Sequence, residues 1–247
     1  MRKSVLPLSI SCLFLSFLLL PAVKAGNTPD HGKVNPTTYK VSAKAGDNTA
    51  YASEMLYDSL KLGRLGLSRQ ALQYAYKGLQ KLVAKGLVVN PSVLTVCDFT
   101  QSSENKRMYI IDVKKCQLLL NTYVAHGRNS GLSFAERFSN SISSLESSLG
   151  FYVTKNIYFG KHGRSLRLAG LEKGFNDNAE RRAVVVHGAP YIGEQRAEAA
   201  YMGRSFGCPA VPEYLADKVI NLIKDGTCLF IYHPSRSYLH GSRILNG

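Results

Sequence analysis

Two short motifs contain residue types that could carry out covalent chemistry. His187 and Gly188 follow a run of three valines, and Cys208 lies in the run Gly-Arg-Ser-Phe-Gly-Cys-Pro at 203–209. A thiol attacks a carbonyl as the thiolate, and a neighbouring imidazole can produce that thiolate by accepting the proton. Gly207 permits a tight turn that exposes the sulfur, and the N–H groups of Gly207 and Cys208 could then stabilise an oxyanion. These residue types fit a cysteine acyltransferase or hydrolase.

The pair alone leaves a structural role open. A buried cysteine commonly acts as a small apolar residue, and a single histidine is commonly a hydrogen-bonded core residue. A metal site is disfavoured, because no second ligand lies at helical or hairpin spacing from either residue. The five cysteines form no paired C-x-x-C motifs, which also excludes a zinc ribbon.

The elements that would position these residues are mostly strands. Short apolar or alternating runs predict strands at 93–99, 108–113, 118–124, 151–159, 166–171, 183–186 and 227–232. His187 would leave the end of one of these strands and be held rigidly there. Pro212 is expected to open a helix that runs through Lys224. The serine-rich segment 127–150 has little periodicity and could hold a short helix over 141–149.

Two helices are predicted ahead of the strands. The first spans 50–62, and the second begins after the N-cap residue Ser68 and ends at Gly86. The apolar face of the second helix comprises Leu72, Ala75, Tyr76, Leu79, Leu82 and Val83. We expect a helical preface at 48–90, with a packing role, and a catalytic domain at 91–247.

The first 25 residues have the form of a secretory signal peptide. Arg2 and Lys3 precede an apolar run, and Pro21 and a small-residue site follow it, with cleavage expected after Ala25. An uncleaved membrane anchor is the alternative, since the run is close to the lower length limit for a membrane span. Residues 26–47 would form a flexible leader. Cleavage would leave no stable membrane anchor.

Composition restricts the class of protein. The chain has 247 residues, 45% of them hydrophobic, which is too apolar for a disordered protein and ample for a large core. Lys and Arg number 31 against 17 Asp and Glu, a net charge of +14, which suggests an acidic or polyanionic environment outside the cytoplasm. The basic residues are scattered, so nucleic acid is not indicated as a partner.

The two motifs together resemble those of the YkuD-type L,D-transpeptidases. That family has a histidine, a gap of about this length, and then Ser-His-Gly-Cys. The resemblance extends to short motifs in the family's order at 98–99, 107–112, 124–131, 138–140, 147–150, 165–168, 170–172 and 176–177. Together these resemble the murein L,D-transpeptidase catalytic domain family from about residue 93 onward. The implied fold is mainly β (α+β), a β-sandwich or distorted barrel with a small helical preface.

The resemblance implies an enzyme that acts on peptidoglycan stem peptides. Cys208 would be the nucleophile and His187 the general base, with the Gly188 carbonyl orienting the imidazole. A thioester acyl-enzyme would form as the terminal D-alanine leaves, and an amine of a second stem would resolve it into a 3–3 cross-link. Water as the acceptor would make the protein an L,D-carboxypeptidase, and a non-catalytic cell-wall binding protein is a further alternative. No metal or organic cofactor is implied, and the implied location is the periplasm.

This sequence departs from the family motif at two positions. Phe206 replaces the second histidine, so any role of that histidine cannot be transferred, and Phe206 could pack or wall the site. Ala210 replaces an arginine suited to a substrate carboxylate. Arg204 is our first candidate for that cation, and Arg128 and Arg167 are weaker ones. Ser205 and Tyr191 are the other residues expected to contact substrate.

Several further residues are candidates for structural roles. His126 and His162 lie beside glycines in expected loops and could border the site. Cys97, Cys116 and Cys228 are each expected to lie in a strand, where burial is the default, although an oxidising compartment would permit a Cys97–Cys116 disulfide. Asn176 and Asp177 (residues 176–177) are typical of a turn with its own side-chain hydrogen bonds.

Overall fold

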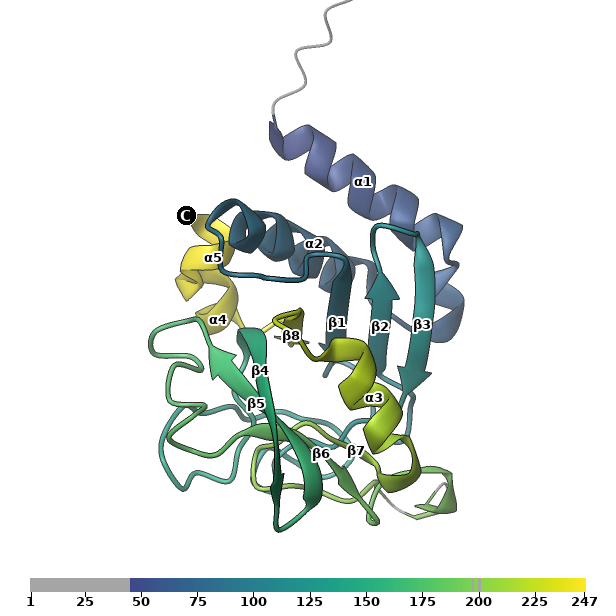
Figure 1. Cartoon of the computed structure of the whole chain (residues 1–247), viewed down its shortest axis with the longest axis vertical. Helices are drawn as coiled ribbons and strands as arrows, with labels where there is room; N and C mark the ends of the chain where they lie inside the picture. Colours follow the sequence, from purple (N-terminus) through teal and green to yellow (C-terminus); the bar gives the residue numbers. More distant parts are fainter. Residues whose placement is uncertain (1–44, 197, 200) are drawn as a thin grey trace, which may run out of the picture. The chain divides into compact units, whose positions relative to one another are not determined.

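The computed structural model describes residues 45–196, 198–199 and 201–247 (Figure 1). The expected signal peptide and residues 26–44 of the expected leader lie outside the described residues. Within the described ranges, no helix combines the length and apolar character needed to cross a membrane.

Within the described residues, the α-helices α1 and α2 precede the strands, as predicted. Helix α1 (Ala45–Ser59) begins at Ala45 rather than at residue 50, and a short 3-10 helix η1 (Leu62–Leu65) follows it. Helix α2 (Arg69–Ala84) begins where Ser68 caps it, with the hydroxyl accepting from the Ala71 N–H at 3.3 Å. Gly86 then turns the chain at φ 67°. The boundaries of the preface and catalytic domain remain predictions.

Eight strands in the described part of the chain form one mixed sheet, which confirms the expected mainly-β class. They are β1 (Val93–Asp98), β2 (Met108–Asp112), β3 (Gln117–Thr122), β4 (Gly150–Gly160), β5 (Gly163–Gly170), β6 (Val185–Ala189), β7 (Ala210–Pro212) and β8 (Cys228–Tyr232). Their order is β3-β2-β1-β8-β4-β5-β6-β7. The pairs β1–β8 and β6–β7 are parallel, and the other neighbours are antiparallel.

The two ends of this strand order meet, so the sheet curves into a nearly closed barrel. The chain that leaves β3 runs beside the segment that leads into β7. The Ala125 N–H donates to the Ala210 carbonyl at 2.8 Å, and the Ser205 N–H donates to the His126 carbonyl at 2.9 Å. A further bridge joins Gly127 to Ser205. This seam places the cysteine motif at the line where the barrel closes.

Helices fill the remaining core positions. The buried face of α2 packs against β1 and β8, and α3 (Ala216–Ile223) contacts β1, β5 and β6 (Figure 1). A 3-10 turn η3 (Glu213–Leu215) precedes α3, so the helix expected after Pro212 is confirmed with a tighter first turn. The short helices η2 (Glu194–Arg196), α4 (Arg236–Gly241) and α5 (Arg243–Asn246) were not predicted.

Two predicted elements differ from the structure. Strand β6 begins at Val185 and includes His187, so His187 lies within the strand rather than beyond its end. Ala183 delays the strand, because its φ of 51° is left-handed and incompatible with extended pairing. The helix considered over 141–149 does not form, since Ser143 and Leu145 have φ values of 61° and 58°. That segment winds through turns instead.

Candidate active site

His187 is fixed in the sheet by strands on both sides. Its register pairs it with Ser165 of β5 and with Ala210 of β7, and it is 2% exposed. The expected contact with Gly188 is present, with Nδ1 lying 2.8 Å from the Gly188 carbonyl. Because a carbonyl only accepts, this contact requires the proton on Nδ1 and leaves Nε2 able to accept another.

Cys208 follows a turn in which the preceding residue, Gly207, has to be glycine. Gly207 has φ 118°, and a Cβ there would approach the Glu146 carbonyl to 2.7 Å. The Cys208 thiol donates to the Ala183 carbonyl, with Sγ 3.6 Å from the oxygen. Val185 makes a backbone hydrogen bond to the same sulfur. Since Val185 and His187 lie two residues apart on β6, the thiol and the imidazole belong to one site.

Ser205 and the Gly207 amide are engaged within the turn. Ser205 is 3% exposed, and its hydroxyl donates to the Cys208 carbonyl at 2.6 Å. The Gly207 N–H, expected to face an oxyanion, instead donates to Ser205 Oγ at 3.0 Å. The Cys208 N–H makes no hydrogen bond within the described part of the chain. In this state only the Cys208 amide of the expected pair is available, and Ser205 holds the turn rather than facing the cleft.

Burial keeps the thiol and the imidazole neutral. Burial raises the pKa of the Cys208 thiol, against opposing effects of the Val185 hydrogen bond and the Arg182 charge. Burial likewise lowers the pKa of His187, against the hydrogen bond to Gly188 and with a smaller contribution from His162. Both shifts disfavour the charged form of the group, so the site holds a neutral pair rather than a thiolate and an imidazolium.

Arg182 is a site residue that sequence reasoning missed. Its guanidinium donates to the Ser139 carbonyl at 2.7 Å, to Ser144 Oγ at 3.1 Å, and to Ser148 Oγ and the Glu146 carbonyl. It also lies against Gly207, where a Cβ would meet Nη2 at 3.1 Å. The serine-rich segment therefore wraps a half-buried cation beside the thiol. The Arg181-Arg182 pair before the strand was the available signal, but it does not reveal these contacts.

His162 also reaches the site, from the tip of the β4–β5 hairpin. Its ring stacks on that of His187, with centroids 4.2 Å apart and planes at 22°. Tyr191 lies near the thiol, and burial, followed by the Cys208 charge, raises its pKa to about 12. The structure thus brings His162 and Tyr191 to the same site as His187 and Cys208.

The candidate cations occupy two separate places. Arg204 and Arg128 line a cleft of about 530 Å³ together with Arg137 and residues 131–134 and 136. Arg204 Nη1 donates to the carbonyls of Arg128 and Gly131 at 2.8 and 3.1 Å. Arg128 lies over the ring of Phe206, which is 67% exposed. Arg167 instead lines a separate pocket, formed partly by Ala183, Val184 and Val185.

His126 has a structural environment. It is fully buried, its Nδ1 lies 2.7 Å from Nη2 of the buried Arg107, and its Nε2 lies 3.3 Å from the Gly131 carbonyl. Burial, followed by the Arg107 charge, lowers the pKa of His126 to about 3. Arg107 also donates to the Val124 carbonyl at 3.0 Å, so this pair fixes the chain that forms one side of the barrel seam.

The remaining sequence candidates have defined positions. Cys97, Cys116 and Cys228 are free thiols. Cys97 pairs with Met108, whereas Cys116 lies exposed in the turn beyond Asp112. The two thiols are therefore at opposite ends of the strand pair. Cys116 is not in a strand, contrary to expectation. The turn at 176–177 is confirmed, since Asn176 Oδ1 accepts from Glu172 and Asp177 Oδ1 accepts from Gly174.

Comparison with known proteins identifies the family. A sequence model described as the L,D-transpeptidase catalytic domain matches residues 64–232. That match covers more than half of the chain and includes His187 and Cys208. The protein therefore belongs to the L,D-transpeptidase catalytic domain family, of the YkuD type.

Solved structures similar to this chain are also L,D-transpeptidases. One is the L,D-transpeptidase LdtMt1 in complex with imipenem, 11% identical over 57% of this chain and 59% of that chain, with a TM-score of 0.36. The L,D-transpeptidase from Mycobacterium smegmatis is 12% identical over the same shares, with the same TM-score. The L,D-transpeptidase from Stackebrandtia nassauensis is 11% identical over 76% of this chain and 78% of that chain, with a TM-score of 0.33.

The match to the first of these structures spans 59% of its length. No curated protein matches this chain.

Proposed function

We propose that this protein is an exported L,D-transpeptidase that forms 3–3 cross-links between peptidoglycan stem peptides through a thioester on Cys208. The observation that carries the proposal is the site at the barrel seam. There, β6 supplies both the His187 imidazole, with its proton directed to Gly188, and the Val185 backbone contact to the Cys208 sulfur. Membership of the L,D-transpeptidase catalytic domain family supports the choice of reaction.

The first half of the reaction transfers the acyl group to sulfur. His187 Nε2 takes the thiol proton as Cys208 Sγ attacks the carbonyl at the L-centre of the diaminoacyl residue. A C–S bond forms, and the amide C–N bond to the terminal D-alanine then breaks. The imidazolium returns its proton to the departing amine. The Gly188 carbonyl stabilises the imidazolium during this step, in place of the carboxylate of other triads.

The Cys208 N–H is the first donor available to stabilise the oxyanion, since the Gly207 N–H donates to Ser205 Oγ. Rotation of the Ser205 hydroxyl side chain would release the second amide. Arg182 lies behind the same turn and offsets part of the desolvation of the sulfur. The turn and the serine-rich segment together thus hold the donors in place before the charge develops.

The second half transfers the acyl group to an acceptor. The amine of a neighbouring stem attacks the thioester, His187 takes its proton, and the C–S bond breaks to restore the thiol. Water in place of the amine would yield an L,D-carboxypeptidase product. Arg204, with Arg128 in the adjacent cleft, supplies positive charge for a carboxylate of the stem.

The substrate is part of the cell wall, so we propose that the protein works in the periplasm after export by residues 1–25. The net positive charge suits the anionic wall polymer.

Intact mass spectrometry tests the proposed chemistry. The mature protein is incubated with a disaccharide-tetrapeptide and, separately, with a carbapenem. We expect a covalent adduct on wild-type protein and none on the Cys208→Ala variant. Adding an acceptor stem peptide should convert the adduct into a cross-linked dimer, whereas a hydrolysed tripeptide alone would identify a carboxypeptidase. A folded, reduced wild-type protein that forms no adduct with either reagent would favour a non-catalytic binding protein.

A further inference from the structure

A small pocket shares two residues with the surroundings of the Cys208 thiol. It has a volume of about 220 Å³ and is lined by Tyr158, Arg167, Leu168, Glu180 and residues 183–185. Two of its walls are the groups that hold the sulfur, because the Ala183 carbonyl accepts from the thiol and Val185 contacts it through the backbone. A group bound in this pocket would therefore lie against two residues that contact the Cys208 sulfur.

Arg167 is held on the catalytic face of the sheet. In the β5–β6 register, Ser165 pairs with His187 and Arg167 pairs with Val185. Residues two apart on a strand share a face, and directly paired residues lie on the same side. Arg167 therefore projects from the same face as the His187 imidazole. The Tyr158 ring fixes its guanidinium, which lies 4.5 Å from the ring centroid.

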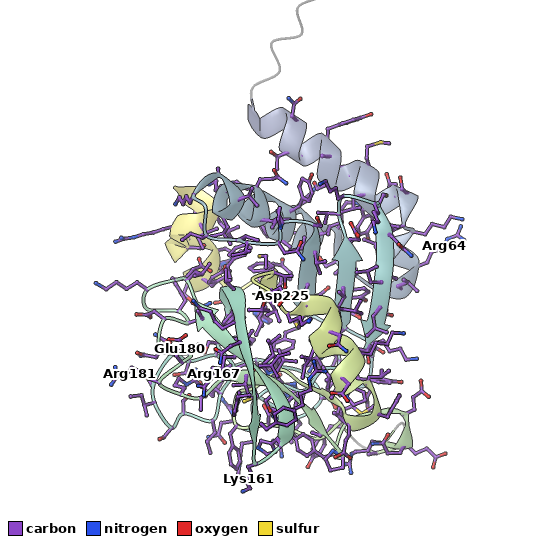
Figure 2. All side chains as sticks on the ribbon, in the orientation of Figure 1. Arg64, Lys161, Arg167, Glu180, Arg181 and Asp225 are labelled. Atoms are coloured by element: carbon purple, nitrogen blue, oxygen red, sulfur yellow. The ribbon has the colours of Figure 1, made fainter. Side chains whose placement is uncertain are left out.

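Glu180 brings the opposite charge to the same pocket from a different element. It lies in the turn before β6, whose backbone is closed by the Ala183 N–H donating to the Glu180 carbonyl at 3.0 Å. Figure 2 shows Arg167 and Glu180 on the same side of the molecule. Within the described residues, the Glu180 carboxylate has no salt-bridge partner, and the Arg167 guanidinium has none either. The pocket thus presents a cation and an anion that do not neutralise each other.

We propose that this pocket binds the α-amino-acid head of a diaminoacyl residue, with Arg167 on its carboxylate and Glu180 on its ammonium group. The inference rests on the proposed function, because such a head occurs on the D-centre of a peptidoglycan stem. An α-amino-acid head carries both charges on one carbon, which matches one cation and one anion in a small pocket. A lysine side chain would present only the ammonium group.

The head has two sources in this reaction. In the donor stem it lies at the far end of the side chain whose L-centre carbonyl is attacked. In the acceptor stem its deprotonated amine is the group that attacks the thioester. The two cases differ in the step they affect, because acylation involves only the donor and resolution involves both stems.

Charge-deleted substrates and variants test the pocket. Tetrapeptides carrying diaminopimelate, D-centre-amidated diaminopimelate, D-centre N-acetylated diaminopimelate or lysine are compared with wild-type, Arg167→Gln and Glu180→Gln proteins. We expect about a tenfold loss of kcat/KM for wild type when either charge of the head is removed. Arg167→Gln should abolish the preference for a free carboxylate, and Glu180→Gln the preference for a free ammonium. Arg181→Gln is the matched control, since this exposed neighbour does not line the pocket.

The same experiments distinguish the donor stem from the acceptor stem as the source of the head. They also separate failure of the pocket proposal from failure of the transpeptidase proposal. A preference seen in the acylation rate assigns the head to the donor. A preference seen only in transfer from a preformed adduct assigns it to the acceptor. Transfer is compared for the diaminopimelate, amidated and lysine peptides alone, because the N-acetylated peptide lacks the attacking amine. Equal rates for all four peptides, or equal losses in the three variants, would overturn the inference while leaving the transpeptidase proposal intact. If wild type forms no adduct, calorimetry can still measure the binding of the four peptides to Cys208→Ala. Tighter binding of the peptide with the free head would support the pocket proposal, and uniform affinities would refute it.

Discussion

The helical side of the barrel and the seam side are stabilised by different interactions. On the helical side, α2 buries Leu72, Ala75, Leu79 and Leu82 against β1 and β8, and stacked rings such as Phe151 and Phe230 complete the core. On the seam side, buried polar groups dominate, with Arg107 bonded to His126 and Arg182 bonded to the serine-rich segment. Apolar packing tolerates small adjustments, whereas a buried polar network requires each partner in place.

This difference indicates how the two sides divide their tasks. The helical side supplies free energy of folding through apolar area removed from water. The seam side holds a thiol, an imidazole and backbone donors in fixed directions at some cost in desolvation. Substitutions should therefore separate stability from catalysis according to the side on which they fall.

The largest effect should come from His187. We expect His187→Gln to lower kcat by about a thousandfold, because the proposed general base is lost while a hydrogen-bonding side chain remains. The free energy of unfolding should change by less than about 1 kcal/mol, since glutamine can still donate to the Gly188 carbonyl. Rates of acyl-enzyme formation and urea denaturation curves measure the two quantities.

His126→Gln is the matched control for that prediction. This second buried histidine is bonded to Arg107 and lies in the seam without reaching the thiol. Its replacement should cost about 2 kcal/mol of stability while the folded fraction keeps most of its activity. More than a tenth of wild-type activity in His187→Gln would contradict the assignment of the base.

A substitution on the helical side should lower stability and leave kcat unchanged. Gly78 of α2 faces Phe151 of β4, and a Cβ at this position would come 2.0 Å from the Phe151 ring. Gly78→Ala should therefore destabilise the fold by about 2 kcal/mol through overpacking, with kcat of the folded protein unchanged. Adding Phe151→Leu should recover part of the loss in thermal unfolding. Lys77→Ala, an exposed neighbour on α2, should unfold like wild type, and a similarly mild Gly78→Ala would show that the helix can shift.

The smallest effect concerns the ionisation of the thiol. Because burial raises the pKa of Cys208 above its ordinary value of 9.0, the thiolate fraction is small at neutral pH and rises with pH. Alkylation of Cys208 by iodoacetamide should accelerate about tenfold per pH unit from pH 7 to 9 without a plateau. Peptide mass spectrometry can follow it with the exposed Cys116 as an internal reference. A plateau below pH 8 would instead indicate a thiolate–imidazolium pair.

The helical side could be predicted from the sequence, and the seam only in part. Apolar spacing located α2 and most strands because burial of one face determines that spacing. It missed β7, which has three residues, and misplaced the start of β6 because a left-handed Ala183 cannot be recognised from residue type. The motif predicted His187 and Cys208 as the catalytic pair, and this assignment remains a prediction. His162 was predicted only as a residue that could border the site, and Arg182 was missed, since its contacts come from a segment remote in sequence.

The barrel seam also has a consequence for the order of folding. Ser205 meets His126 across 79 residues of chain, and this contact fixes the turn that carries Cys208. Closing so long a loop is entropically costly, so local hairpins such as β4–β5 should form well before it. During refolding, the Cys208 thiol should therefore remain accessible to reagents in solution after most of the sheet has assembled. The site around Cys208 would then form when the barrel closes, at the end of folding, and not during the initial collapse of the chain.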